Sequence, residues 1–353
     1  MRIISGIRPT GVIHLGNYLG AIRNWLNLQN KKSNHCLYFI ADYHSFTDPP
    51  VSAEEKKKII ETMMIDYLAL GLDPKKSILF LQSQIPEVAE ISWLINCLTP
   101  MGELERMTQY KDKSRKQADN INAGLFTYPS LMAADVLTFK AEGVPVGDDQ
   151  LQHLEFAREA ARRFNRLYGK TFLEPKSLLT LVPRLMSLKN PLEKMSKVDP
   201  DSYIYVLDDP KMITLKIKSA TSASNDFFER IHFANNDFVF EVKSTYSDHP
   251  EIEKMEAAIR NLLLMYQEFC SKEFKALLKG DEIDIERLRY SEIKTKLAEA
   301  IIKYFEPARV RKQVLLKNKK KVLKTFLDGS KSARLIARKT LKEVKDKIGL
   351  VQS

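Results

Sequence analysis

The sequence contains only three cysteines, and no two of them form a C-x-x-C pair. Cys36, Cys97 and Cys270 each lie in an apolar stretch, so we expect three buried thiols in a reducing compartment. No apolar run approaches the length of about 18 residues that a membrane span needs. No apolar stretch follows a basic head at the N-terminus either. These absences predict a cytoplasmic globular protein without a membrane-spanning segment.

Familiar catalytic and nucleotide-binding patterns are missing as well. Neither G-x-G-x-x-G nor G-x-x-x-x-G-K-[ST] occurs, which argues against a Rossmann dinucleotide fingerprint and a P-loop. The sequence shows no recognisable Ser-His-Asp or Cys-His arrangement of the kind that supports nucleophilic catalysis. A site that works by positioning and charge is therefore favoured over covalent catalysis.

The sequence does have an unusual junction, GIRPTGVIHLGN, at residues 6–17, whose ordering costs much backbone entropy. It places four glycine or proline residues and one histidine where the first predicted strand meets a helix. Glycine loses more backbone entropy on folding than any other residue, and a structural turn needs only one or two. Ligands bind at such junctions in parallel sheets, because the helix offers free backbone N–H groups. The alternative is a glycine-rich turn with a structural histidine.

Positive charge is concentrated at the C-terminal end of the chain. The net charge is +11, and residues 301–353 hold 16 Lys or Arg against 4 Asp or Glu, a balance of +12. Segments 310–324 and 332–347 place apolar residues at helical spacing with basic residues between them. We expect two amphipathic helices with a cationic face that binds RNA or DNA backbone. The alternative is a solvated basic surface.

The pattern along the chain alternates between strand and helix. Strands are predicted at 2–5, 35–41, 78–82 and within 177–188, and helices at 17–30, 53–70, 87–98, 102–117 and 126–142. The stretch 143–169 is predicted to hold a short strand, a turn and a long helix. Gly71 and Pro74 end the second helix. The alternation predicts a parallel sheet with right-handed crossovers. From Asp209 onward the pattern is nearly all helical, except for a strand-like or irregular stretch at 235–249.

A polar loop, LEKMSKVDP, follows the last predicted strand and carries Lys194 and Lys197. Two lysines three residues apart on a mobile loop suit the charge that develops on a leaving pyrophosphate. A solvated loop would also carry lysines, so this pair alone is a weak signal.

Taken together, HLGN and KMSK resemble the HIGH and KMSKS signatures of class I aminoacyl-tRNA synthetases. Six blocks, in order, resemble the bacterial-type tryptophanyl-tRNA synthetases: GIRPTGVIHLGNYLGA, GELERMTQYKDKS, TYPSLMAAD, VPVGDDQLQHLE, KMSKVDP and KTLKEVKDKIGL. The resemblance covers nearly the whole chain except about 225–250. The combination of LMAAD with VPVGDDQ resembles the tryptophan-specific enzymes more than the tyrosine-specific enzymes of the same class.

The resemblance implies an α/β fold with a doubly wound, Rossmann-like parallel sheet, a helical insertion and a helical C-terminal domain. The implied domains are 1–106 with 178–208 for ATP binding and catalysis, 107–177 for the insertion, and 209–353 for tRNA binding. It also implies a homodimer formed largely through the insertion.

The implied reaction activates L-tryptophan with ATP and then transfers it to tRNA(Trp), which binds through the basic C-terminal helices. Mg²⁺ enters with ATP, and no dedicated metal site is implied. The implied catalytic residues are His14, Lys113, Lys194 and Lys197. The implied ATP-binding residues are Arg8, Pro9, Thr10, Gly16, Asn17, Gly147, Asp148, Asp149, Leu185, Met195, Ser196 and Val198.

The resemblance places a tryptophan pocket on another set of residues. Its members are His44, Gln109, Tyr128, Met132, Asp135, Val144, Val146 and Gln150. Asp135 would accept the indole N–H, and Tyr128 with Gln150 would hold the α-amine. Because an unpaired carboxylate in an apolar helix is costly, we also expect a buried partner for Asp135.

Two positions depart from the family pattern. Val198 stands where serine is usual, and Arg8 stands where many members have glutamine. Neither change removes a lysine, so we expect activity with altered ATP affinity or inhibitor response. Three alternatives stay open: the tyrosine-specific sister enzyme, a non-charging paralogue that only binds RNA, and a small-molecule nucleotidyltransferase.

Overall fold

The computed structural model describes residues 1–108, 110–111, 121–147, 150–179, 185–195, 199–222 and 225–351. The chain divides into two compact units. The first unit comprises residues 1–11, 21–181 and 314–353, and the second unit comprises residues 12–20 and 182–313. Within the described residues, no helix is both long enough and apolar enough to cross a membrane.

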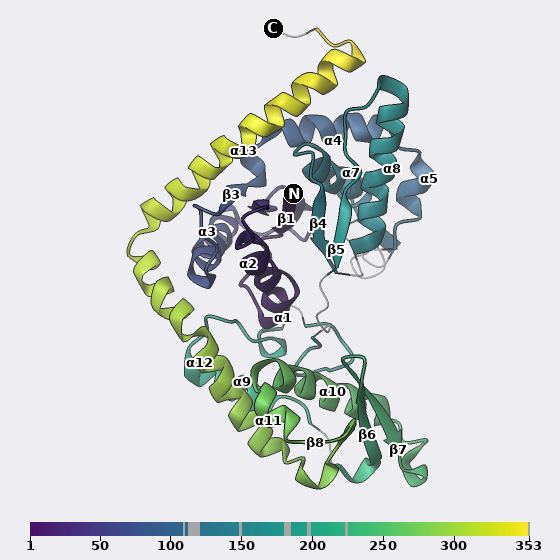
Figure 1. Cartoon of the computed structure of the whole chain (residues 1–353), viewed down its shortest axis with the longest axis vertical. Helices are drawn as coiled ribbons and strands as arrows, with labels where there is room; N and C mark the ends of the chain where they lie inside the picture. The colour runs from purple at the N-terminus through teal and green to yellow at the C-terminus, as the bar shows by residue number, and fades with distance from the viewer. Residues whose placement is uncertain are drawn as a thin grey trace. The chain divides into compact units, whose positions relative to one another are not determined.

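A five-stranded parallel sheet forms the centre of the first unit (Figure 1). Its order is β3 (Ser77–Leu81), β2 (His35–Ile40), β1 (Arg2–Ile7), β4 (Gly143–Val146) and β5 (Lys176–Leu179). The chain therefore starts in the middle of the sheet and builds outward in both directions, which is a doubly wound arrangement. This confirms the predicted parallel sheet.

Helices cover both faces of this sheet. The helices are α2 (Arg23–Gln29), α3 (Ala53–Leu70), α4 (Pro86–Leu98), α5 (Met101–Glu105), α7 (Ala123–Leu137) and α8 (Leu151–Tyr168). On one face, Leu37 and Phe39 of β2 join a core with α4, α7 and α8. On the other, Tyr38 stacks on Trp25 of α2 at 4.6 Å between ring centroids. Successive residues of a strand alternate between faces, so β2 holds the two layers together.

A last helix, α13 (Lys319–Ile348), also belongs to the first unit and lies along β3 (Figure 1). A Cβ atom on Gly329 would lie 1.9 Å from the carbonyl oxygen of Leu79. The hydroxyl of Ser330 accepts a hydrogen bond from the Leu81 N–H (3.3 Å). Small residues thus let the helix cover the edge strand, where unpaired backbone groups would otherwise be exposed. The predicted C-terminal domain 209–353 includes α13. In the structure α13 belongs instead to the first unit, because it packs on the parallel sheet.

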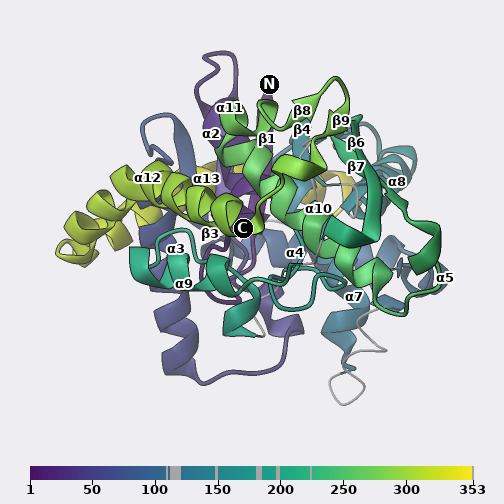
Figure 2. The same ribbon diagram turned by 90° about the horizontal axis from the view of Figure 1, so that it is seen from below.

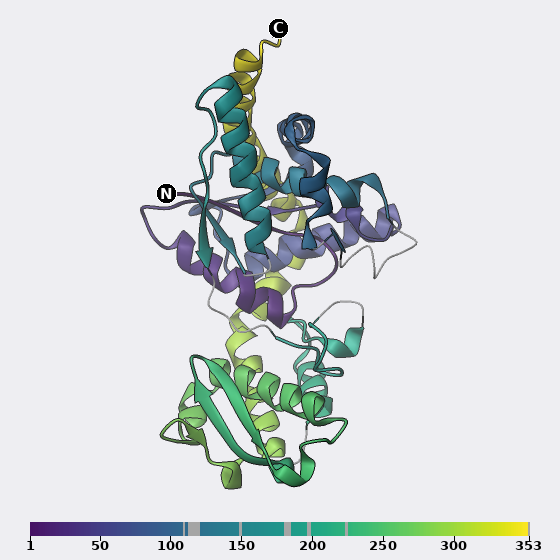
Figure 3. The same cartoon turned by 90° about the vertical axis from the view of Figure 1, so that its right-hand side faces the viewer.

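The second unit combines helices with a four-stranded antiparallel sheet, order β7-β6-β9-β8. Its elements are α1 (Leu15–Asn17), α9 (Pro210–Ser219), β6 (Phe228–Ala234), β7 (Asp237–Val242), α10 (Ile252–Phe269), α11 (Ser271–Lys275), β8 (Leu278–Lys279), β9 (Glu282–Ile283) and most of α12 (Tyr290–Leu316). Figures 2 and 3 show the β6–β7 hairpin beside α10. The strand-like stretch predicted at 235–249 contains β7, whereas β6, β8 and β9 lie where the sequence predicts helix, and there the prediction is wrong. Asn235 and Asn236, both at positive φ (53° and 61°), form the two-residue turn that pairs the strands.

One of the three cysteines also differs from expectation. Cys36 and Cys270 are buried, but Cys97 is exposed. It lies on the outward face of α4, four residues after Trp93 and four before Met101. Trp93 is 67% exposed and Met101 63% exposed. Helical spacing places Trp93 and Cys97 on one exposed face of α4, whereas Met101 begins α5 after α4 has ended.

Candidate active site

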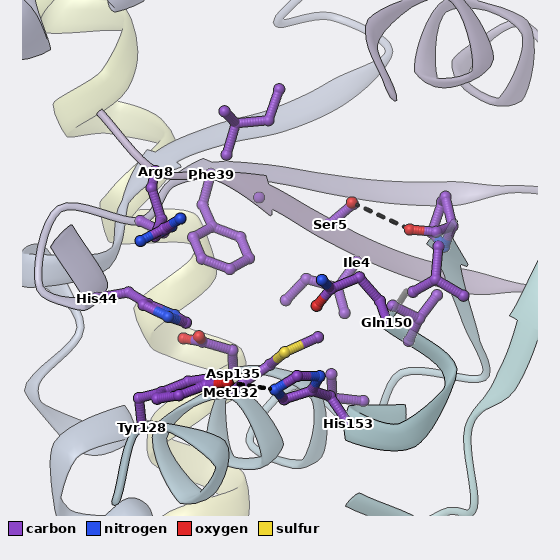
Figure 4. Close-up of a pocket in the computed structure, with 17 residues that line it drawn as sticks. Ile4, Ser5, Arg8, Phe39, His44, Tyr128, Met132, Asp135, Gln150 and His153 are labelled. Carbon is purple, nitrogen blue, oxygen red and sulfur yellow. Dashed lines mark hydrogen bonds between the residues drawn. The ribbon is translucent and has the colours of Figure 1, made fainter. Parts of the chain in front are cut away.

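A cavity of about 280 Å³ lies at the carboxyl ends of β1, β2 and β4 in the first unit (Figure 4). The strand order reverses between β1 and β4, and this is where open parallel sheets bind ligands. Seven of the eight residues predicted to bind tryptophan line the cavity: His44, Tyr128, Met132, Asp135, Val144, Val146 and Gln150. The eighth, Gln109, lies outside the described residues.

Asp135 is buried in the cavity wall and has the partner that the sequence predicts. The Nε2 group of Gln82 donates to both carboxylate oxygens at 2.8 Å. Gln82 is itself fully buried, and its Oε1 accepts from the His44 N–H at 3.0 Å. Sequence reasoning did not find Gln82, although a glutamine directly after a buried strand is an available signal. Gln82 fixes which way the Asp135 carboxylate faces.

Burial also changes the protonation chemistry of Asp135. Its pKa is raised well above the usual value, first by burial and then by the charge of Asp42, while the Gln82 hydrogen bond opposes the shift. Burial raises the pKa of Asp42 too, against hydrogen bonds from Ser83. The Ser83 N–H donates to Asp42 at 2.8 Å and the Ser83 hydroxyl at 2.5 Å. Burial therefore raises the pKa of both Asp135, which lines the cavity, and Asp42.

Tyr128 forms a second polar cluster in the cavity. Its hydroxyl lies 2.8 Å from Nε2 of His153, a side chain that is 2% exposed. The ring of His44 lies 5.1 Å from the Tyr128 ring. His153 was not among the predicted site residues. The available signal was its position three residues after Gln150, which places both on one face of α8.

Arg8 supplies a cation at the cavity. Its Nη1 lies 2.5 Å from Oδ1 of Asp48, and the Arg8 side chain is 34% exposed. Arg8, one of the two positions that depart from the family pattern, is therefore paired with an acid of the same unit and also lines the cavity.

Close packing explains one glycine of the junction at residues 6–17. A Cβ atom on Gly6 would lie 2.6 Å from the ring of Phe39.

The histidine of the junction lies in the second unit, where His14 and Asn17 bind each other. Nδ1 of His14 accepts from the Asn17 N–H (3.2 Å), and Oδ1 of Asn17 accepts from the His14 N–H (3.4 Å). In the neutral ring the hydrogen must then be on Nε2, which makes Nε2 a donor. A Cβ on Gly16 would lie 3.0 Å from this ring, so glycine allows the close approach.

The residues predicted for ATP binding and catalysis are divided between the units. Arg8, Pro9, Thr10 and Gly147 belong to the first, and His14, Gly16, Asn17, Leu185, Lys194 and Met195 to the second. Lys194 is exposed, on a hairpin whose Leu185 and Met195 are buried. Lys113, Asp148, Asp149, Ser196, Lys197 and Val198 lie outside the described residues.

Comparison with known proteins places this geometry in context. A family model for class I tRNA synthetases (W and Y) matches residues 1–306. The tryptophan–tRNA ligase of Caldanaerobacter subterraneus subsp. tengcongensis is 40% identical over 356 residues, covering 99% of this chain and 98% of that protein. The solved tryptophanyl-tRNA synthetase of Mycoplasma pneumoniae has a TM-score of 0.81 at 30% identity, covering 99% and 98%. That of Campylobacter jejuni, complexed with ADP and tryptophan, has a TM-score of 0.76 at 32% identity, covering 99% and 100%.

Proposed function

The chain belongs to the class I tRNA synthetases specific for tryptophan and tyrosine, and we propose that within this family it is a tryptophan–tRNA ligase. It activates L-tryptophan with ATP and transfers the tryptophanyl group to tRNA(Trp) in the cytoplasm. Full-length relatives with that activity, about 40% identical, favour tryptophan over tyrosine.

The observation that carries the proposal is the buried Asp135 carboxylate in the cavity of the first unit. Asp135 accepts the indole N–H of tryptophan, and Met132, Val144 and Val146 provide apolar contacts to the ring. Tyr128 and Gln150 hold the α-amine. A buried acceptor that needs a donor discriminates against substrates that lack one far more strongly than apolar packing does.

The chemistry of activation matches the residues that the chain provides. A carboxylate oxygen of tryptophan attacks the α-phosphorus of MgATP, and the bond to pyrophosphate breaks. In the second step a hydroxyl at the tRNA 3′ end attacks the acyl carbon, and AMP leaves. Both substrates carry their own nucleophile, so the enzyme contributes position and charge stabilisation. Nε2–H of His14 and the ammonium of Lys194 are donors for phosphate oxygens, and the same roles stay predictions for Lys113 and Lys197.

Amino-acid-dependent ATP–pyrophosphate exchange tests this function. The full chain should support exchange with tryptophan and not with tyrosine, and it should then charge tRNA(Trp). Exchange with tyrosine alone would identify the sister enzyme. RNA binding without exchange would identify a non-charging paralogue.

We also propose that the protein is a homodimer. The exposed residues Trp93 and Cys97 on one face of α4 support a second copy as the partner, because large exposed apolar groups mark interaction sites. These residues precede the insertion 107–177 that the resemblance implies. Trp93→Glu should convert the dimer to a monomer in sedimentation, and a wild-type monomer at micromolar concentration would refute the proposal.

A further inference from the structure

Residues 185–195, which carry Lys194, form a small antiparallel hairpin in the second unit. The Ser187 N–H donates to the Glu193 carbonyl (2.8 Å), and the Met195 N–H donates to the Leu185 carbonyl (3.2 Å). Met186 lies opposite Lys194 between these two bonds. This is the pattern of a non-hydrogen-bonded pair, in which the backbone N–H and C=O of Met186 point away from Lys194.

Asn261, on helix α10, binds both of those outward groups. Its Oδ1 accepts from the Met186 N–H at 2.9 Å, and its Nδ2 donates to the Met186 carbonyl at 2.9 Å. The carboxamide thus makes the two hydrogen bonds that a neighbouring strand would make. Asn261 is 4% exposed, so water is not an adequate substitute for it.

The far part of the hairpin is held by other groups. The Leu188 N–H donates to the Ser202 carbonyl (3.0 Å), and the Leu188 carbonyl accepts from Thr221 (2.8 Å). The side chain of Asn261 is therefore the connection from α10 to Met186, the residue that faces Lys194 directly. A displacement of Met186 would displace the backbone from which Lys194 extends.

We propose that Asn261 is a positioning residue for the activation step, which fixes the hairpin so that Lys194 can bind the phosphates of ATP. The proposal rests on the proposed function, since it takes Lys194 as a phosphate-binding group. Asn261 touches no substrate and acts through Met186. The tryptophan cavity is built from residues of the first unit, so the effect of Asn261 should appear in turnover and not in tryptophan affinity.

The test uses Asn261→Leu in the full chain, which removes both hydrogen bonds at similar volume. We expect kcat of tryptophan-dependent pyrophosphate exchange to fall about 10- to 100-fold, as for other small displacements of reacting groups. The Kd for tryptophan, from equilibrium dialysis, should not change. In the Lys194→Ala background the same substitution should cost no further turnover, because it acts through that lysine.

Asn165 offers a matched control in the first unit. Its side chain also holds a loop backbone, donating to the Phe172 carbonyl (2.9 Å) and accepting from the N–H groups of Thr171 (2.8 Å) and Phe172 (3.0 Å). Asn165→Leu should lower thermal stability and leave kcat near the wild-type value. An equal loss of kcat in both variants would indicate general damage and overturn the proposal.

Two further results decide the matter. Independent, multiplicative losses for Asn261→Leu and Lys194→Ala would show that Asn261 does not act through the lysine. If Asn261→Leu fails to fold, Asn261→Asp keeps only the acceptor for the Met186 N–H and should still lower kcat without changing tryptophan affinity. Hydrogen exchange at the Met186 amide should accelerate in Asn261→Leu, which removes the acceptor of that N–H, and unchanged protection in this variant would overturn the proposal. Exchange by the wild-type chain reports the proposed function separately.

Discussion

At the scale of single residues, Asp135 is the group whose surroundings are most specific. Gln82 binds both of its oxygen atoms, and burial and Asp42 favour its neutral form. The sequence predicts Asp135 and the need for a partner, because one acid in an apolar helix is conspicuous. It does not identify Gln82, which comes from a strand end 53 residues away. Contacts between distant segments depend on the tertiary fold, and a single sequence does not show them.

The first prediction at this scale concerns specificity. Asp135→Ala should raise KM for tryptophan strongly, because the indole N–H is then buried without an acceptor. An isosteric analogue with sulfur in place of the indole nitrogen should be affected far less. Comparing both ligands on both enzymes cancels general damage to the cavity. Equal losses for the two ligands would show that Asp135 does not bind the indole nitrogen.

A second residue-scale prediction follows from the raised pKa of Asp135. The folded pKa of such a carboxyl group exceeds its unfolded pKa. Its contribution to the free energy of unfolding is therefore fully present below about pH 4, and it is lost as pH rises through the folded pKa. Asp135→Asn cannot ionise, so its stability relative to wild type should increase over the range from about pH 4 up to the folded pKa of Asp135. Denaturant unfolding of both proteins across that range measures the difference.

The exposed Asp328 provides the control for this pH series. Hydrogen bonding to Lys324 holds the pKa of Asp328 below its usual value, which is the opposite shift. The contribution of Asp328 to stability is therefore present above its unfolded pKa of about 4 and is lost only as pH falls below that value, so Asp328→Asn should show no trend relative to wild type above about pH 4. Parallel curves for wild type and Asp135→Asn would refute the assignment of a raised pKa to Asp135.

At the scale of secondary structure, most of the first unit could be predicted and much of the second could not. Helix α3 has the predicted bounds, Ala53–Leu70, since an N-cap serine, a regular apolar pattern and a C-terminal glycine agree there. The strands β8 and β9 are two residues each, too short for any periodicity to show. Two helices were predicted over 310–324 and 332–347, but the break between helices lies at 317–318, and 332–347 is part of the single helix α13. The place of α13 on β3 depends on close backbone contact, which hydrophobic patterning does not encode.

Gly329 tests the packing of α13 on the edge strand. Gly329→Ala places a Cβ against the carbonyl oxygen of Leu79, so α13 must move away from β3. We expect a loss of about 1–3 kcal/mol in the free energy of unfolding, as for other overpacked sites. Gly20→Ala is the control, because no atom lies within 4 Å of the added Cβ and the helical segment should be neutral or gain stability. Equal effects at the two glycines would contradict the close approach.

At the scale of the whole molecule, the basic C-terminal segment contains both paired and exposed positive charges. Arg334 and Arg338 both bind the buried carboxylate of Glu87, at 2.8 and 3.3 Å, so part of the positive charge holds α13 to α4. Four lysines lie where α12 ends and α13 begins, and we call them the junction lysines: Lys317 between the helices, and Lys319, Lys320 and Lys321 at the start of α13. They are exposed, and no ion pair involves them among the residues that the structure describes. The +12 balance predicted from the sequence is therefore not all available to a polyanion, and the junction lysines are among the charges that are.

Neutralising the junction lysines tests their role in binding tRNA. Replacing all four by glutamine should weaken tRNA affinity and reduce the slope of log K against log salt by about 1 for each phosphate that a lysine no longer neutralises. Tryptophan-dependent pyrophosphate exchange needs no tRNA and should be unchanged. Replacing Lys31, Lys32, Lys75 and Lys76, which are also exposed, changes the net charge equally and is the matched control. If both quadruple variants reduce affinity and slope alike, net charge alone explains the binding. If only the junction variant does so, these lysines bind the tRNA backbone directly.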